Sequence, residues 1–261
     1  LIKKENIDLI YDEVIDILLE KNKSSKKIKG IELRNIGKLL CKSLIVTTGT
    51  FLRGRIHQGN KNWPAGRMNS DPSIKLANFF KNQKFRIIRL KTGTPPRLIG
   101  TSINYDDCII QKGDSRPEPF SFLTTNFIKK QVPCFITHTN KKTHEIIRKN
   151  LKNSPLFDGS IKSKGPRYCP SVEDKIYRFQ DKESHQIFLE PETIKGEVVY
   201  PNGISTSLPT SIQKSFLQTI NGLEDVKIQQ YGYSIEYDCI DSAEIDQTFQ
   251  SKKIQGLYLA G

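Results

Sequence analysis

The sequence predicts an α/β fold in which an incomplete dinucleotide-binding domain of the Rossmann type is interrupted by an inserted α/β domain. Three observations predict it. Alternating segments at 28–33 and 39–46 form a β-meander that ends in the small-residue turn Thr47-Thr48-Gly49. From about residue 98 to 200 the sequence changes to polar loops and short elements, and the longer apolar pattern then resumes. The chain holds no Gly-x-Gly-x-x-Gly turn, which a complete domain of this type needs to bind a pyrophosphate.

These changes divide the chain into three expected segments. Residues 1–97 form the first, partial stretch of the dinucleotide-binding domain, residues 98–200 the inserted domain, and residues 201–261 a truncated return to the first domain. The single methionine is Met68, and the chain stops at Gly261 after an apolar run, so both ends look cut. We therefore expect an internal fragment of a longer protein, one that by itself binds a dinucleotide weakly or not at all.

The expected elements follow the apolar periodicity. Residues 6–20 fit a helix or a strand equally, and 39–46 reads as one strand. A helix is expected within 69–81, where Asp71-Pro-Ser73 is a start signal. Ser73 can cap this helix or hydrogen-bond a cofactor, and capping is the commoner use of a serine there. Further helices are expected at 143–151 and 209–221, and strands at 185–189, near Val226 and Tyr233, and at 257–260.

Composition narrows the class of protein. Lysine and arginine total 41 against 28 acidic residues, a net charge of +13 that suits a polyanionic partner, although a lysine-biased composition gives the same count. The five cysteines include no Cys-x-x-Cys pair, which argues against a zinc site and a dense disulfide framework; no metal is expected. Apolar runs are too short for a membrane-spanning helix. These features favour a protein of a reducing compartment with no membrane partner.

The segment 165–179, Gly-Pro-Arg-Tyr-Cys-Pro-Ser-Val-Glu-Asp-Lys-Ile-Tyr-Arg-Phe, restricts one cysteine most closely. Pro170 biases Cys169 toward extended backbone, and Ser171 is placed to start a helix, with Asp174 at capping-box spacing. Val172, Ile176 and Phe179 fall on one face of that helix and are expected to anchor it in a core. A thiol just before a helix and close to cations has a lowered pKa, so Cys169 is either a nucleophile or a structural cysteine on a loop.

This segment resembles the signature of the GidA (MnmG) family, flavin-dependent enzymes that modify the wobble uridine of certain tRNAs. Other strings are similar to the same family in the same order: Val46-Thr-Thr-Gly-Thr-Phe-Leu52, Arg89-Leu-Lys-Thr-Gly-Thr-Pro-Pro-Arg97, Ile136-Thr-His-Thr-Asn140, Gln186-Ile-Phe-Leu-Glu-Pro-Glu192, Tyr200-Pro-Asn-Gly-Ile-Ser-Thr-Ser-Leu-Pro209 and Gly232-Tyr-Ser-Ile-Glu-Tyr-Asp238. The resemblance implies a glutathione-reductase-like FAD/NAD(P)-binding Rossmann fold. It makes 1–97 and 201–261 parts of the FAD domain, and 98–200 an inserted nicotinamide or substrate domain.

By this resemblance the enzyme adds an aminomethyl-type group, carboxymethylaminomethyl or taurinomethyl, to C5 of the wobble uridine. Methylenetetrahydrofolate supplies the one-carbon unit, FAD mediates its transfer and reduction, and NADH reduces the flavin. C5 of uracil is a poor nucleophile until a thiolate adds at C6, and cysteine is suited to that step. The resemblance places such a cysteine at Cys169, as the nucleophile or as the acid–base group that completes the substitution.

The resemblance also assigns cofactor-binding positions. FAD contacts are Val14 and Ser73, although 65–73 departs from the family pattern and is one glycine short. The nicotinamide site is lined by Gly165, Pro166, Arg167, Tyr168, Cys169, Pro170, Ser171, Val172, Glu173, Asp174, Lys175, Ile176, Tyr177, Arg178 and Phe179. Lys91 and Arg97, set among glycine and prolines, are candidates for RNA or cofactor phosphate, or for pairing with acidic neighbours.

The implied partners are tRNA, a GTPase of the MnmE type and a second copy of the chain in a homodimer. The implied compartment is the bacterial cytoplasm or the mitochondrial matrix. Two other functions remain open on the sequence: a non-catalytic tRNA-binding module, and a flavin oxidoreductase acting on small molecules. The positive charge and the Tyr-Cys-Pro-Ser string disfavour the latter.

Overall fold

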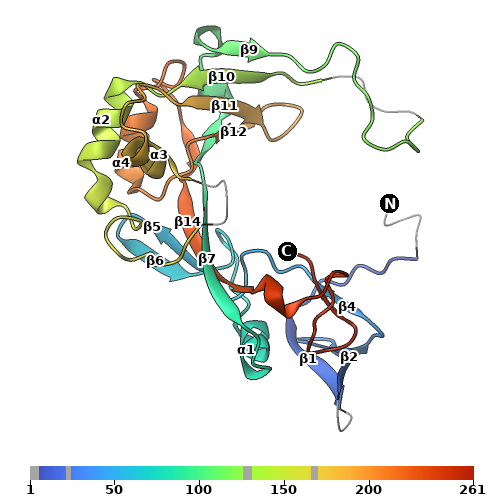
Figure 1. Cartoon of the computed structure of the whole chain (residues 1–261). Coiled ribbons are helices and arrows are strands. Elements are labelled where there is room, and N and C mark those ends of the chain that lie inside the picture. Colours follow the sequence, from blue (N-terminus) through green and yellow to red (C-terminus); the bar gives the residue numbers. More distant parts are fainter. Residues whose placement is uncertain (1–5, 22–24, 126–130, 166–169) are drawn as a thin grey trace. The chain divides into compact units, whose positions relative to one another are not determined.

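The computed structural model describes residues 6–21, 25–125, 131–165 and 170–261 (Figure 1). The chain divides into two compact units, each built from separated stretches of sequence. Unit 1 comprises residues 1–55, 64–90 and 236–261, and unit 2 comprises residues 56–63 and 91–235. The domain boundaries expected at 97/98 and 200/201 stay a prediction, because compactness alone does not define a functional domain.

Unit 1 contains an antiparallel meander, a parallel strand pair and one helix. The meander has the order β1-β2-β3, and β4 pairs in parallel with β15, Leu257 opposite Leu44. The elements are β1 (Val14–Lys21), β2 (Lys26–Leu33), β3 (Gly37–Leu40), β4 (Leu44–Val46), α1 (Ile74–Asn82), the 3₁₀ helix η4 (Ser242–Glu244) and β15 (Leu257–Leu259). A core of buried side chains from α1, the meander and β15 holds them together: Ile17, Ile28, Leu52, Leu76, Ala77, Phe79, Phe80, Phe85, Ile254 and Leu257.

The meander predicted from the alternating pattern is present, but the single strand expected over 39–46 is wrong. The backbone leaves β3 after Leu40, and β4 begins only at Leu44. The physical reason is a change of partner, because β3 pairs with β2 whereas the Leu44 N–H donates to the Gly256 carbonyl at 2.8 Å, beside β15. A strand that pairs with a distant segment cannot be separated from its neighbour by local periodicity.

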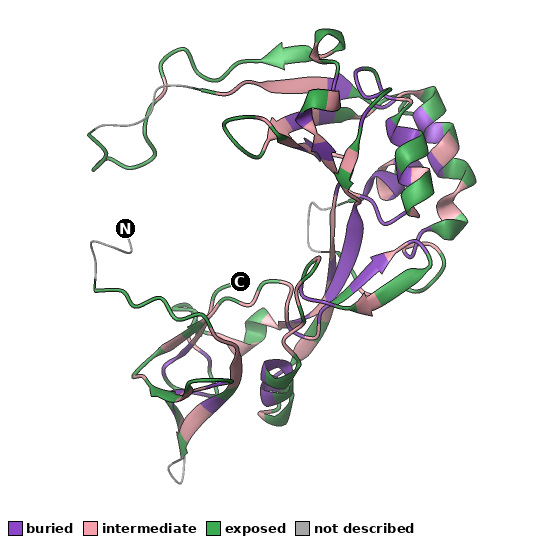
Figure 2. Cartoon of the chain, turned by 180° about the vertical axis from the view of Figure 1, so that it is seen from behind, coloured by how far each residue is buried: buried purple, intermediate pink, exposed green. Residues whose placement is uncertain are grey.

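Unit 2 is a six-stranded antiparallel sheet with helices packed on one face. The strand order is β13-β8-β12-β11-β10-β9. Its elements are β8 (Arg97–Ile99), η1 (Gly100–Ser102), η2 (Tyr105–Asp107), β9 (Ile109–Gln111), β10 (Cys134–His138), α2 (Lys141–Lys149), η3 (Leu151–Asn153), α3 (Val172–Arg178), β11 (Gln186–Pro191), β12 (Val198–Asn202), α4 (Thr210–Leu217) and β13 (Ile228–Gln230). Figure 2 shows that α2 and α4 each have a buried side and an exposed side, as amphipathic helices on a sheet require.

The core of unit 2 explains why these helices form. Ile187 and Leu189 alternate inward along β11, and Ile147 of α2 and Phe216 of α4 pack in the same cluster. The start of α2 is fixed by a capping box, in which the Asn140 side chain accepts from the Thr143 N–H at 3.0 Å.

The chain passes between the units within four strands. These are β5 (Arg55–Gln58), β6 (Lys61–Pro64), β7 (Ile87–Thr94) and β14 (Tyr233–Ile240), hydrogen-bonded in the order β6-β5-β14-β7. The strand expected near Tyr233 is therefore part of a long strand that continues to Ile240.

Candidate functional site

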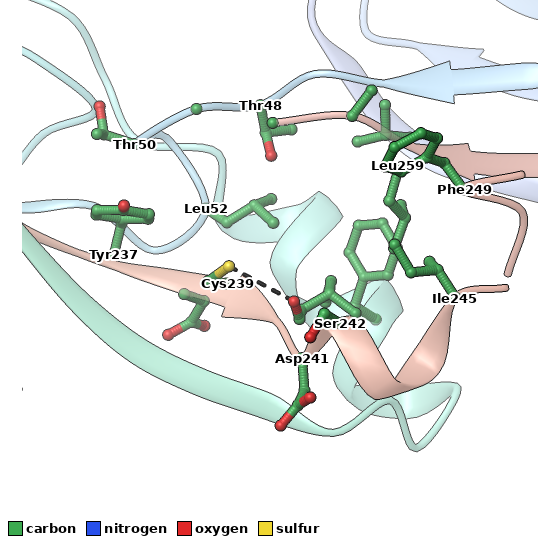
Figure 3. A pocket seen from close by; sticks show the side chains of 17 residues that line it. Thr48, Thr50, Leu52, Tyr237, Cys239, Asp241, Ser242, Ile245, Phe249 and Leu259 are labelled. Atoms are coloured by element: carbon green, nitrogen blue, oxygen red, sulfur yellow. Dashed lines mark hydrogen bonds between the residues drawn. The ribbon is translucent and has the colours of Figure 1, made fainter. Parts of the chain in front are cut away.

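A cavity of about 480 Å³ lies in unit 1 beside the carboxyl ends of the parallel strands β4 and β15 (Figure 3). Val46 and Leu259 end these strands, and Thr48, Gly49, Ala260 and Gly261 continue along the wall. Ligands of α/β proteins bind outside the carboxyl ends of parallel strands, where the backbone turns away from the sheet. The turn Thr47-Thr48-Gly49 predicted from sequence therefore borders the cavity.

The backbone of this wall is shaped by small residues. Gly49 has a φ of +52°, a left-handed conformation that favours glycine, and a Cβ added there would meet no atom within 4 Å. The Ala260 N–H donates to the Val46 carbonyl at 3.0 Å, and the Gly49 N–H to the Gly261 carbonyl at 3.3 Å. These bonds hold the segments that follow β4 and β15 side by side, and a Cβ at Gly49 would extend into open space that a ligand can occupy.

The opposite wall comes from the end of β14 and the segment after it. Leu52, Cys239, Ile245 and Phe249 line the cavity with Phe80 of α1, so the lining is mainly apolar (Figure 3). The Cys239 thiol donates to the Ile240 carbonyl, with 3.5 Å between sulfur and oxygen. Burial, and then the charge of Asp241, raises the pKa of this thiol, so it stays protonated near neutral pH.

The acidic groups that line the cavity are balanced by arginines. Asp238 is nearly buried and lies 2.8 Å from Nη1 of Arg89 and 3.0 Å from Nε of Arg53. Asp241 lies 3.0 Å from Nε of Arg86. The cavity is thus an apolar slot with compensated charge, which suits the flat ring system of a dinucleotide cofactor better than a free anion or cation.

The two predicted FAD contacts lie in unit 1. Val14 begins β1 opposite Leu33, and Ser73 directly precedes α1. The Ser73 hydroxyl makes no capping hydrogen bond, although its N–H donates to the Phe51 carbonyl at 2.9 Å. The capping use of Ser73 is therefore wrong. Neither residue lines the cavity, but Ser73 bridges to Leu52, which does.

The predicted nicotinamide segment lies in unit 2, and Pro166, Arg167, Tyr168 and Cys169 fall outside the described residues. The helix predicted after them is present as α3, and the Ser171 hydroxyl accepts from the Asp174 N–H at 3.2 Å. Ser171, Val172, Glu173 and Ile176 are buried, whereas the helix ends exposed, with Tyr177, Arg178 and Phe179 on the surface. The expectation that Phe179 anchors the core is wrong, because Phe179 is the residue at which the helix ends and its ring lies outside the cluster.

Glu173 joins α3 to the segment that follows β12. Its Oε1 accepts from the Thr206 hydroxyl at 2.9 Å and from the Ser207 N–H at 3.0 Å, and the side chain is fully buried. The Val172 N–H donates to the Ser205 carbonyl and the Lys175 ammonium to the Gly203 carbonyl. These bonds fix the first turn of α3, and the cofactor contact predicted for Glu173 stays a prediction.

The structure separates the roles open to Lys91 and Arg97. Lys91 lies within β7 and is only 4% exposed, so it does not present its ammonium to a macromolecular surface. Arg97 lies 2.6 Å from Glu192 and stacks on the Tyr200 ring with 4.4 Å to its centroid. Arg97 therefore pairs with an acidic neighbour, which was one of its two expected roles, and its binding to RNA stays a prediction.

The comparisons with known proteins cover nearly the whole chain. The model of the family described as "Glucose inhibited division protein A" matches residues 1–261. The tRNA uridine 5-carboxymethylaminomethyl modification enzyme MnmG of Syntrophotalea carbinolica is 48% identical over 98% of this chain and 40% of that protein, and MnmG of Aliarcobacter butzleri is 44% identical. Two solved structures of GidA from Aquifex aeolicus match with TM-scores of 0.85 and 0.87, covering 96% and 99% of this chain.

The chain belongs to the GidA family. Its fold class is confirmed as the Rossmann-type FAD/NAD(P)-binding fold with an inserted α/β part, because the match to GidA covers both units. The GidA-family chain spans about 40% of the length of the curated relatives that it matches. No helix in the described part of the chain is long and apolar enough to cross a membrane. Nor do the described residues contain a group of three or more metal-ligating side chains.

Sequence reasoning on the GidA-family chain missed much of the cavity. Cys239, Asp241, Ile245 and Phe249 line it, yet none belonged to the predicted site. One available signal was the string Gly232–Asp238, which leads directly into this wall. The unusual backbone of Phe249, with a φ of +63°, could not be read from the sequence and is seen only in the structure.

Unit 2 contains a pair of stacked histidines, His144 and His185. The His144 and His185 rings stack with 5.3 Å between centroids, and Thr139 Oγ1 lies 2.8 Å from Nε2 of His144. Burial, with the positive charge of Arg148, lowers the pKa of His144. Burial, with His144, Lys175 and Lys182, lowers the pKa of His185 to about 4. Both rings are therefore neutral at neutral pH.

This pair predicts that unit 2 loses stability as the pH falls from about 6.5 to 4. The unfolded histidines take up protons near pH 6.5 and the folded ones only at lower pH, so the unfolded state binds more protons in this window. Above pH 6.5 the two neutral histidines make their full contribution to the free energy of unfolding. We expect a loss of about 1–2 kcal/mol, reduced by solvent screening because His185 is half-buried.

Urea unfolding at pH 7.5 and pH 5 measures this change in unfolding free energy. The variant His144→Gln/His185→Gln should flatten the pH dependence, and the exposed His138→Gln should leave it unchanged. An unaltered dependence in the double variant would refute the assignment.

Proposed function

We propose that this chain is part of an FAD-dependent tRNA-modifying enzyme that adds a carboxymethylaminomethyl-type group to C5 of the wobble uridine. The observation that carries the proposal is the 48% identity, over 98% of the chain, to a protein named for that activity. The proposal includes taurinomethyl as the alternative group. The bacterial relatives favour the bacterial cytoplasm over the mitochondrial matrix.

The cavity of unit 1 supports an FAD site. Gly49, Ala260 and Gly261 let backbone approach a flat ligand closely, and Leu52, Cys239 and Phe249 cover it with apolar surface. When bound, FAD supplies the redox chemistry, with methylenetetrahydrofolate as the one-carbon donor and NADH as the reductant. The residues that line the cavity orient the ring system of FAD and exclude water. Val14 and Ser73, which lie outside the cavity, contact another part of FAD in this proposal.

Cys169 carries the covalent step in this proposal. Its thiolate adds to C6 of uracil, which makes C5 nucleophilic, or it acts as the acid–base group that completes the substitution. In this proposal residues 165–179 line the nicotinamide site. Among the described residues of this segment, Ser171, Val172, Glu173 and Ile176 are buried in unit 2. The proposed partners are tRNA, an MnmE-type GTPase and a second copy of the chain.

Mass-spectrometric analysis of tRNA nucleosides from cells that lack the full-length gene tests the activity. We expect the C5-modified wobble uridine to disappear and to return when the wild-type gene is restored. Unchanged nucleosides in the deletion strain would overturn the proposed activity and leave only the fold and family.

A further inference from the structure

The segment that follows α3 is hydrogen-bonded to α2 in unit 2, through Arg148. The Phe157 and Tyr177 rings meet edge to face with 5.2 Å between centroids. The Gln180 amide donates to the Tyr177 carbonyl at 3.2 Å, and Arg148 donates to the Gln180 carbonyl at 3.1 Å. The Lys182 ammonium lies 5.8 Å from the centroid of the Phe179 ring. We call this surface the aromatic-basic patch: Arg148, Phe157, Tyr177, Phe179 and Lys182.

The two terminal rings of the patch are open to solvent. Tyr177 is 53% exposed and Phe179 is 50% exposed, although Val172 and Ile176 of the same helix are fully buried. Neighbouring exposed aromatic side chains indicate a binding surface, because they leave apolar area in water. Rings this open do not enclose a small molecule, since small-ligand sites bury most of the ligand surface.

Charges of both signs lie around the rings, because Asp158 and Asp181 directly adjoin Phe157 and Lys182 in the sequence. Arg148 and Lys182 form no ion pair with any of the described residues, and the acidic neighbours Asp174 and Glu183 pair with Arg178 and Lys141. The lowered pKa values of His144 and His185 report the same field, because Arg148 and Lys182 contribute to them. Lys149 and Lys152 follow Arg148 by one and four residues. These cations can pair with the phosphates of a polyanion.

We propose that the aromatic-basic patch binds single-stranded RNA, with bases stacked on Tyr177 and Phe179 and phosphates held by Arg148 and Lys182. Stacking on aromatic rings beside cations is the way proteins hold unpaired bases, and every base offers a flat face. That the RNA is the anticodon loop of a tRNA rests on the proposed function. A dinucleotide cofactor has the same base and phosphate chemistry, but the open rings and the run of cations favour a longer strand.

The test uses the full-length protein and a labelled synthetic RNA hairpin with a uridine-containing single-stranded loop. Fluorescence anisotropy measures its Kd at several salt concentrations, and a fully paired duplex of equal length serves for comparison. Tyr177→Ala/Phe179→Ala should weaken hairpin binding about 10- to 100-fold and duplex binding little. Tyr177→Phe/Phe179→Tyr, which keeps both rings, should retain the wild-type affinity.

Two further variants separate stacking from charge. Arg148→Gln/Lys182→Gln should lower the slope of log Kd against log salt by about 1.4 for two phosphate contacts. The matched control is Phe120→Ala/Phe122→Ala, whose rings are fully exposed in another loop of unit 2. This pair should leave hairpin affinity unchanged. Thermal unfolding by circular dichroism must show that each variant is folded.

The patch assignment would be overturned if Tyr177→Ala/Phe179→Ala bound the hairpin with wild-type affinity. It would also be overturned if the control Phe120→Ala/Phe122→Ala lost as much hairpin affinity as that variant. A raised KM for NADH with unchanged hairpin affinity would assign the rings to the cofactor instead and also overturn it. The nucleoside analysis reports separately on the activity. If the deletion leaves the nucleosides unchanged while the alanine pair loses the hairpin, the proposed activity fails and the patch stands.

Discussion

Replacing Cys169 by serine in the full-length protein should abolish modification of the wobble uridine while leaving FAD bound. A serine hydroxyl is a far weaker nucleophile than a thiolate, so the loss of activity should be on the order of 10³-fold or more. The other four cysteines are poor candidates. Burial raises the pKa of the thiols of Cys41, Cys108, Cys134 and Cys239, so each is held in its unreactive form.

The measurement combines nucleoside mass spectrometry of tRNA with the flavin absorbance of the purified variant. Cys134→Ser is the matched control, because this half-buried thiol lies on β10 of the same unit, and it should retain modification and flavin. Modification retained by Cys169→Ser would contradict the catalytic assignment. Loss of modification together with loss of flavin would indicate a folding defect rather than a missing nucleophile.

Replacing Phe80 by alanine should destabilise unit 1 by about 3–5 kcal/mol. The Phe80 ring is fully buried and meets Phe79 and Phe85 edge to face, with centroids 5.5 and 5.4 Å away. Its removal leaves a void in the core of unit 1 and takes away one of the side chains that line the cavity. The expected result is therefore a large loss of unfolding free energy and weaker flavin binding.

Phe249→Ala provides the control, because Phe249 lines the same cavity but is 61% exposed. It should change the unfolding free energy by no more than about 0.5 kcal/mol. Hydrogen exchange of the α1 amides measures the stability of unit 1 separately from that of unit 2. Similar losses in both variants, or a loss below 1 kcal/mol for Phe80→Ala, would contradict the packing argument.

Local patterns predicted much of the secondary structure. The start of α3 after Ser171, a helix in the region of α2 and the alternating strand β2 were expected from residues close in sequence. Their causes are local as well, since capping and side-chain alternation depend on neighbours a few positions apart. The family too could be inferred from sequence, because long ordered strings leave little room for chance.

The candidate site depended on contacts between distant segments. Lys91 was a candidate phosphate ligand but is buried within β7, and of the two roles expected for Arg97 the structure shows the ion pair, with Glu192. The Arg97 contact follows from strand pairing, because β8 lies beside β12 and Arg97 meets Glu192 from 95 positions away. Lys91 is buried within β7, which belongs to another sheet. The burial expected for Phe179 was also wrong. Its spacing from Val172 and Ile176 suggested the buried face of the helix, but the helix ends at Phe179.

Residue patterns alone indicated the family, the fold class, the order of most elements and the choice of Cys169 as the reactive thiol to test. Contacts between distant segments established that β4 pairs with β15 and that their carboxyl ends border an apolar cavity with Cys239 and Phe249. They also established that the Tyr177 and Phe179 rings stay exposed at the end of α3. The physical reason is that periodicity and capping are encoded by near neighbours. A cavity or a surface patch instead exists only where separate segments meet, and which segments meet is set by packing and strand pairing.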